Sequence, residues 1–151
     1  MARGVALTQL RWSDLDAFDH VNNVQIVRLL EEARVRVFWP ATPAEGTAAS
    51  TTFDPKSTVV VARQEIQYSQ PIPYFSDPLV IEIWVGRFGG ASVDIYYEVK
   101  APESAPPASY AIAMTTIVFL DKETLRPRKL YDDEREFWGR FVDDPLEFRR
   151  S

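Results

Sequence analysis

The chain has 151 residues, of which 46% are hydrophobic and 26% charged, and its net charge is −5. This length predicts a single domain with a core of its own. Cysteine is absent and His20 is the only histidine, which excludes thiol nucleophiles, thiolate metal sites and sites built from several histidines. The negative net charge argues against sequence-independent binding to nucleic acid. No apolar run reaches the roughly 20 residues of a membrane span. Catalysis would therefore depend on carboxylates, hydroxyls, amides or backbone N–H groups, and the lack of cysteine fits a cytoplasmic protein.

The first predicted elements are a short extended segment at 5–12 and a helix at about 23–38. Asn22 or Asn23 can cap this helix, because an amide oxygen accepts hydrogen bonds from the free N–H groups of the first turn. Apolar residues then recur along one helical face, at Ile26, Leu30, Ala33 and Val37. Pro40 ends the run.

After a loop at 40–56, four segments show the two-residue alternation that is typical of strands. They lie at 58–68, 79–87, 93–99 and 110–120. The Gly89-Gly90 pair between the second and third of them predicts a hairpin. A short helix is expected at 131–140, and a charged tail follows Pro145.

This order predicts an α+β protein with one antiparallel sheet of five strands and one long helix. The segment at 79–87 places Leu79 and Ile81 on one side and Val80 and Trp84 on the other, so both sides of the sheet carry apolar groups. Oligomerisation is an economical way to bury the second face and the sheet edges.

The segment from Asp14 to Asn23 is the most unusual part of the sequence. Three carboxylates, one imidazole and two amides crowd into these ten residues, directly before the predicted helix. Turns and helix caps use the same residue types, so capping alone would explain the cluster. The functional interpretation is a carboxylate that acts as nucleophile or general base beside a helix N-terminus that stabilises an oxyanion. Those two parts are the minimum for hydrolysing an activated acyl group.

The same segment resembles a known protein family. It reads Trp12-Ser-Asp14-Leu-Asp16-Ala-Phe-Asp19-His20-Val21-Asn22-Asn23 and is followed by Leu30-Glu31-Glu32-Ala33-Arg34. This resembles the hotdog-fold acyl-CoA thioesterases of the 4-hydroxybenzoyl-CoA thioesterase-like class, whose pattern is approximately D-x-D-x-x-G-H-V-N-N and then E-x-A-R on a helix. Residues 64–72 and 87–92 resemble that family's second strand and its hairpin. The resemblance covers about residues 5–121, and motif, helix and strand order agree.

The resemblance implies a hotdog fold, in which an antiparallel five-stranded sheet wraps around one long central helix. It implies a single domain over 1–151, with a core at about 5–121 and a C-terminal helix and charged tail at 131–151. The implied reaction is hydrolysis of an acyl-CoA thioester, in a homodimer or a homotetramer with active sites at the subunit boundary. No metal and no cofactor beyond the CoA of the substrate is expected, and no nucleic-acid or membrane partner.

Residue by residue, Asp16 corresponds to the family's catalytic carboxylate. The turn and helix start that face the thioester carbonyl correspond to His20, Val21, Asn22 and Asn23. The family usually has glycine before the histidine, where this chain has Asp19. Aspartate tolerates a left-handed backbone better than most residues, so the motif is expected to survive. A second carboxylate there could raise the pKa of Asp16 or repel an anionic substrate.

The hairpin residues Arg87, Gly90 and Ser92 correspond to a region that lies near the nucleotide or pantetheine part of CoA in relatives. Arg63 and Lys100 are further candidates for CoA phosphates, because cationic side chains bind phosphate. A solvated charge at a strand end explains these cations equally well.

Two aromatic residues, Phe18 and Tyr68, are candidates for the wall of an acyl pocket, with core packing as the alternative. Two other functions stay open beside hydrolysis. One is a binding protein that holds acyl-CoA, or an acyl chain on a carrier protein, without turnover. The other is a structural module for oligomerisation.

Overall fold

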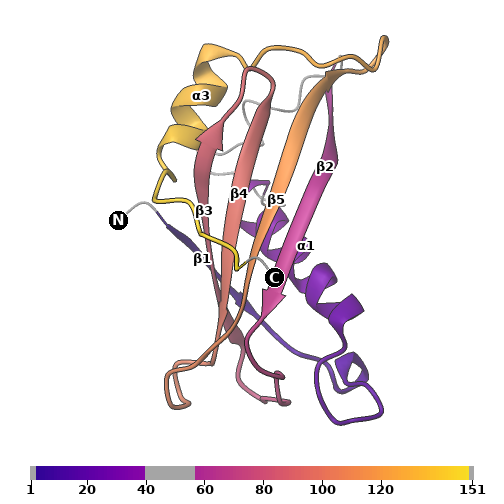
Figure 1. Cartoon of the computed structure of the whole chain (residues 1–151), viewed down its shortest axis with the longest axis vertical. Coiled ribbons are helices and arrows are strands. Elements are labelled where there is room, and N and C mark those ends of the chain that lie inside the picture. The colour runs from indigo at the N-terminus through magenta and orange to yellow at the C-terminus, as the bar shows by residue number, and fades with distance from the viewer. Residues whose placement is uncertain (1–2, 40–56, 150–151) are drawn as a thin grey trace.

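A computed structural model describes residues 3–39 and 57–149. Its elements are β1 (Gly4–Thr8), the 3₁₀ turn η1 (Trp12–Asp14), α1 (Asn23–Phe38), β2 (Ser57–Tyr68), β3 (Leu79–Phe88), β4 (Ser92–Lys100), β5 (Ser109–Asp121) and α3 (Asp132–Gly139) (Figure 1). The predicted helix at 23–38 has these bounds, and the four later strands agree with their predictions to within one residue at each end. The loop predicted at 40–56 lies outside the described residues.

The five strands form one antiparallel sheet in the order β1-β3-β4-β5-β2, so that β1 and β2 are its two edges. Helix α1 lies against one face, called the inner face below, and packs mainly on β1 and β3 (Figure 1). A five-stranded antiparallel sheet with a helix on one face agrees with the hotdog fold that the resemblance implies. Helix α1 is 16 residues long, and α3 adds a second helix of eight residues.

Local signals define both ends of α1. The Asn22 side chain accepts a hydrogen bond from the N–H of Val24 at 3.0 Å, which is the geometry of an N-cap. The apolar side of the helix is buried against the inner face, through Ile26, Leu29, Leu30, Ala33 and Phe38. Burying each of the larger side chains contributes about 1.5–3 kcal/mol. Within residues 3–39 and 57–149, no helix is long and apolar enough to cross a membrane.

The first predicted strand, at 5–12, is too long. Strand β1 ends at Thr8, and the chain then turns through η1. The carboxylate of Asp14 accepts the backbone N–H of Arg11 at 2.7 Å, and the N–H of Asp14 donates to the Arg11 carbonyl at 2.9 Å. These local bonds close a turn where continued alternation would have extended the strand.

Helix α3 closes the end of the sheet that holds the β3–β4 hairpin. Its Trp138 is fully buried and contacts Phe38 of α1, with ring centroids 4.6 Å apart. Its Glu134 is also fully buried, and its two carboxylate oxygens accept the guanidinium of Arg128 at 2.8 and 2.9 Å. Arg135 donates to the carbonyl of Gly89 in the hairpin at 3.2 Å. This end of the sheet is therefore sealed by aromatic packing and a buried ion pair.

The charged tail lies on the outer face of its own sheet. The indole N–H of Trp84 donates to the carbonyl of Asp144 at 2.9 Å, and Phe148 stacks on Tyr96 with ring centroids 6.4 Å apart. Part of the apolar outer face that was expected to need a partner subunit is thus covered by residues 142–149 of the same chain.

Candidate active site

The loop before α1 is held in place by Asp14. Its side chain is fully buried and accepts hydrogen bonds from the guanidinium groups of Arg11 at 2.9 Å and Arg28 at 3.0 Å. Burial alone would raise the pKa of Asp14, but hydrogen bonds from Arg11 and the positive charges of Arg28 and Arg11 hold it below its usual value. The Asp14 carbonyl also accepts the N–H of Asn22 at 2.8 Å. Asp14 therefore fixes both ends of the loop that contains Asp16.

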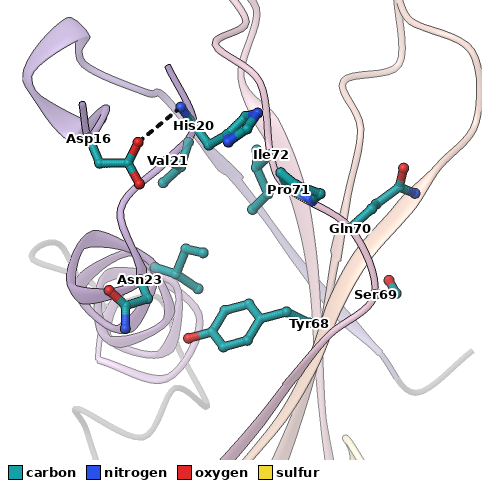
Figure 2. Close-up of a pocket in the computed structure, with 10 residues that line it drawn as sticks. Asp16, His20, Val21, Asn23, Tyr68, Ser69, Gln70, Pro71 and Ile72 are labelled. Carbon is teal, nitrogen blue, oxygen red and sulfur yellow. Dashed lines mark hydrogen bonds between the residues drawn. The ribbon is translucent and has the colours of Figure 1, made fainter. Parts of the chain in front are cut away.

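Asp16 is half-buried and forms a turn with its own loop. One carboxylate oxygen accepts the backbone N–H of His20 at 3.3 Å (Figure 2). The same oxygen accepts the backbone N–H of Phe18 at 2.8 Å. Within the described residues, the second oxygen has no donor. This turn explains why an aspartate stands at position 16. It also fixes the orientation of the carboxylate, whose second oxygen can interact with a ligand.

Asp19 stands where the resembling family has glycine, and its backbone is left-handed with φ of 62°. Glycine adopts this conformation without strain, and aspartate is among the residues that tolerate it best. The N–H of Asp19 donates to the Asp16 carbonyl at 3.2 Å. Asp19 thus adopts the left-handed backbone that was expected at this position.

At the start of α1, most backbone N–H groups are already used. The N–H of Val21 donates to the Ile72 carbonyl at 2.9 Å, that of Asn22 to Asp14, and that of Val24 to the Asn22 side chain. Across residues 3–39 and 57–149, the N–H of Asn23 has no acceptor. The site predicted over residues 21–23 thus contains one free backbone donor, at the positive end of the helix dipole.

A cavity of about 440 Å³ lies between this loop and the end of β2 (Figure 2). It is lined by Asp16, His20, Val21, Asn23, Ile26, Tyr68, Ser69, Gln70, Pro71 and Ile72. The Tyr68 phenol points across the cavity toward Asn23, and the His20 imidazole is turned toward Pro71. Burial raises the pKa of Tyr68, so its hydroxyl remains protonated and can donate a hydrogen bond.

The predicted site residues divide into two groups around this cavity. Asp16, His20, Val21, Asn23 and Tyr68 are part of its wall. Asn22 is turned into the helix as its cap, and Phe18 is 78% exposed and does not line the cavity.

The wall also contains residues that were not predicted as site residues. They are Ile26 and the four residues that follow β2, namely Ser69, Gln70, Pro71 and Ile72. Residues 64–72 resemble the family's second strand and its ending, which was the only signal for the four residues that follow β2.

The predicted CoA-binding hairpin lies at the other end of the sheet. Ser92 pairs with Val118 of β5, whereas Tyr68 pairs with Ala111, seven residues earlier on the same strand. At about 3.3 Å per residue, these positions are about 23 Å apart. The hairpin also forms a hydrogen bond within its own chain, because the Gly90 carbonyl accepts the N–H of Leu130 at 3.0 Å. One chain therefore does not bring the hairpin to Asp16.

The three candidate cations for CoA phosphates differ in their surroundings. Arg63 pairs with Glu65 at 3.2 Å, and Lys100 pairs with Glu82 at 2.9 Å. Arg87 is exposed and makes no ion pair with any residue that the structure describes. Of the three, Arg87 is the cation that is free to meet a phosphate.

Comparison with known proteins gives one family and a group of similar structures. The family model of the thioesterase-like superfamily matches residues 10–142. The chain is similar to a predicted thioesterase of Bacillus stearothermophilus, with a TM-score of 0.75, 22% identity and coverage of 96% of this chain and 100% of the other. It is similar to YbaW, a probable thioesterase of Escherichia coli, with a TM-score of 0.72, 24% identity and coverage of 95% and 100%.

A third similar structure is a thioesterase of Thermus thermophilus in complex with coenzyme A and Zn. Its TM-score is 0.69 at 26% identity, and the match covers 89% of this chain and 90% of the other. A comparison with curated proteins gave no significant match.

Proposed function

The chain belongs to the thioesterase-like superfamily, and we propose that it hydrolyses acyl-CoA thioesters to the free acid and CoA. One observation supports this most directly: Asp16 and Asn23 line the same cavity, and among the described residues one Asp16 carboxylate oxygen has no donor and the Asn23 N–H has no acceptor. The similar thioesterase that was crystallised with coenzyme A supports CoA as the thiol part of the substrate. We also propose that the protein is cytoplasmic.

In the proposed reaction, the thioester carbonyl oxygen accepts the N–H of Asn23. The partial positive charge of the helix start stabilises the negative charge that develops on this oxygen. Asp16 either attacks the carbonyl carbon or removes a proton from an attacking water. The carbon–sulfur bond breaks, and the sulfur leaves as the CoA thiolate and is protonated. In the general-base route the water oxygen enters the carboxylic acid directly, and in the nucleophilic route water hydrolyses the anhydride formed between the acyl group and Asp16.

The two roles of Asp16 predict different oxygen labelling. In a single turnover in ¹⁸O-water, a nucleophilic Asp16 forms a mixed anhydride with the acyl group. If water attacks the Asp16 carbonyl of this anhydride, the label enters the Asp16 carboxylate and an unlabelled Asp16 oxygen passes to the acid. A general base, or water attack on the acyl carbonyl of the anhydride, places the label in the acid. Label in the peptide that contains Asp16, measured by mass spectrometry, therefore identifies a nucleophilic Asp16, and trapping of the acylated Asp16 peptide identifies it when the label is found in the acid.

We further propose a homodimer whose active sites lie at the subunit boundary. Edge strand β2 leaves Val60 and Val61 about half-exposed, and Val24 and Val35 are exposed on α1. A partner that covers these residues could also bring its own hairpin to this chain's cavity, which one chain cannot do. Assembly of two dimers into a tetramer is compatible with this arrangement.

Mixing two inactive variants tests the shared site. If Asp16 acts in one subunit and Arg87 of the other subunit binds CoA, Asp16→Asn and Arg87→Ala homodimers are each impaired. Subunit exchange between them then forms mixed dimers in which one of the two sites is intact, so activity returns. Exchange without recovery, checked by mass spectrometry of differently tagged subunits, would mean that both residues serve the same chain's site.

Two other functions are separated by two assays on the unmodified protein. Release of thiol from a panel of short, long, branched and aromatic acyl-CoAs indicates hydrolysis. Without release, a rise in the unfolding temperature with CoA or acyl-CoA indicates a binding protein, because a ligand of the native state raises apparent stability. No response in either assay would indicate a structural module for oligomerisation. Asp19 beside the reaction centre is the feature that favours binding without turnover.

A further inference from the structure

A chain of polar side chains crosses the inner face of the sheet, and the proposed catalytic steps do not use it. Arg34 of α1 donates to the Tyr97 hydroxyl of β4 at 2.9 Å. Tyr97 donates to Thr115 of β5 at 2.9 Å, and Thr115 donates to the side-chain carbonyl of Gln64 on β2 at 3.2 Å. These four residues, called the inner polar chain below, connect the helix to the far edge of the sheet.

Three of the four residues of the inner polar chain are buried, whereas Gln64, at its β2 end, is exposed. Arg34 is only 7% exposed, and Tyr97 and Thr115 are fully buried. The ion-pair partner of Arg34 is Glu31, at 3.7 Å, and the Glu31 side chain is mostly exposed. Burial raises the pKa of Tyr97, so the phenol remains a neutral donor. Apolar side chains would fill this space without the desolvation cost of a guanidinium and two hydroxyls.

The position of the inner polar chain relates it to the cavity. Helix α1 packs on β1 and β3, whereas β2 lies at the opposite edge of the sheet. The cavity lies between the start of α1 and the end of β2. Among the described side chains, the inner polar chain provides the only hydrogen-bonded connection from α1 to β2.

The cavity and the inner polar chain lie at different positions along the same two elements, α1 and β2. Arg34 is two helical turns beyond Ile26, a distance of about 12 Å. Gln64 is four residues before Tyr68 and on the same side of β2, about 13 Å away. The inner polar chain therefore links α1 to β2 at a similar distance from the cavity along both elements, so it can set their separation at the cavity.

We propose that Tyr97 is a positioning residue that fixes the separation of α1 from β2 and thereby the width of the acyl pocket between Asn23 and Tyr68. This inference rests on the proposed thioesterase function. It assigns to the inner polar chain the selection of acyl groups, and not a step of the chemistry.

The test compares Tyr97→Phe with Tyr96→Phe. Tyr96 is the next residue of β4, is 6% exposed, faces the outer side of the sheet and makes no side-chain hydrogen bond within the described residues. Each variant loses one phenolic oxygen from a buried ring. For Tyr97→Phe we expect kcat/KM to fall about 10- to 100-fold for the best acyl-CoA, mainly through KM, with a smaller loss for bulkier acyl groups. For Tyr96→Phe the order of preference among acyl groups stays that of the unmodified protein.

Thr115 provides a second route in case Tyr97→Phe does not fold. Thr115→Val removes the hydroxyl at constant shape, and Thr115→Ser keeps it. We expect Thr115→Val to change the acyl preference in the same way and Thr115→Ser to retain the original preference. An unchanged order of acyl preference in Tyr97→Phe and Thr115→Val would overturn the proposal, even if both variants were less stable.

Hydrogen exchange supplies a readout that does not need turnover. We expect faster amide exchange in β2 and α1 for Tyr97→Phe than for Tyr96→Phe, and equal exchange in these elements would overturn the positioning role. If the unmodified protein hydrolyses no thioester in the panel, the proposed thioesterase function fails. Amide hydrogen exchange alone then decides whether the inner polar chain positions β2.

Discussion

The two ends of the sheet are built in opposite ways. At the hairpin end, α3 buries Trp138, and the carboxylate of Glu134 is fully paired with Arg128. At the cavity end, Asp16 keeps one oxygen without a donor and Asn23 keeps an N–H without an acceptor, as far as the described residues extend.

The difference separates groups that stabilise the fold from groups that can act on a ligand. A buried polar group contributes to stability only when its hydrogen bonds are made, and the Arg128–Glu134 pair at the hairpin end meets this condition, although the buried indole N–H of Trp138 has no acceptor among the described residues. Groups that are positioned but left unpaired can instead bind a substrate. Substitutions at the hairpin end should therefore change stability, and those at the cavity end should change activity.

The largest expected effect is on catalysis. We expect Asp16→Asn to lower kcat/KM for acyl-CoA hydrolysis about 10²- to 10⁴-fold, because the amide can neither attack the carbonyl nor take a proton. The unfolding temperature should stay close to that of the unmodified protein, because the amide oxygen can still accept from Phe18 and His20. Thiol release and thermal unfolding measure the two effects, and full residual activity would refute the role of Asp16.

The next largest effect is expected at the hairpin end. Arg128→Met leaves the fully buried Glu134 without its cation, which should lower the free energy of unfolding by about 3–5 kcal/mol. Arg126→Met is the matched control, because Arg126 is exposed and, among the described residues, only its backbone forms hydrogen bonds. Chemical denaturation measures both variants, and equal stabilities would show that the buried pair contributes nothing.

A smaller and pH-dependent effect is expected for Asp14. Its pKa in the folded protein lies below its ordinary value of 3.8, so its ionised form stabilises the fold above that pH. This contribution is lost as the pH falls through the lowered pKa. We expect Asp14→Asn to be less stable at neutral pH by about 1–3 kcal/mol and to lose less stability on acidification. Asp144→Asn, which removes an exposed carboxylate, should follow the acid denaturation curve of the unmodified protein.

The smallest expected effect is at the helix cap. Asn22→Ala removes the acceptor for the Val24 N–H and should lower the free energy of unfolding by about 1 kcal/mol. Asn22→Ser keeps a cap oxygen and should recover most of this loss. Because the Asn23 N–H stays in place, kcat should change little. A collapse of kcat in both variants would place Asn22 in the catalytic site instead of the helix cap.

Several features of the fold could be predicted because their causes are local. The bounds of α1 follow from the Asn22 cap, the buried stripe and Pro40, all of which lie within 19 residues. The β3–β4 hairpin follows from Gly89-Gly90 between two alternating segments. Strand β1 was predicted too long because the turn at Asp14 depends on side-chain hydrogen bonds that hydrophobic alternation does not reveal.

The candidate site was predictable only in part. The motif pointed to Asp16, His20, Val21 and Asn23, and Tyr68 was a candidate as an aromatic residue of the acyl pocket; all five line one cavity. Phe18 was not separable from them by sequence, because residue type and spacing do not reveal on which side of a turn a ring emerges. Nor could the motif show that Val21 donates to Ile72, a contact between residues 51 positions apart.

By itself, the sequence determined the α+β class, the limits of the helix and of four strands, and the cluster of carboxylates and amides before a helix. Each of these depends on periodicity, caps and turns within a short stretch of chain. Only the tertiary structure decided that the Asn23 N–H has no acceptor among the described residues and that the hairpin lies at the end of the sheet away from Asp16. It also decided that Arg34, Tyr97, Thr115 and Gln64 form one hydrogen-bonded chain. These features depend on strand order and register, which join residues far apart in sequence, and no local pattern encodes them.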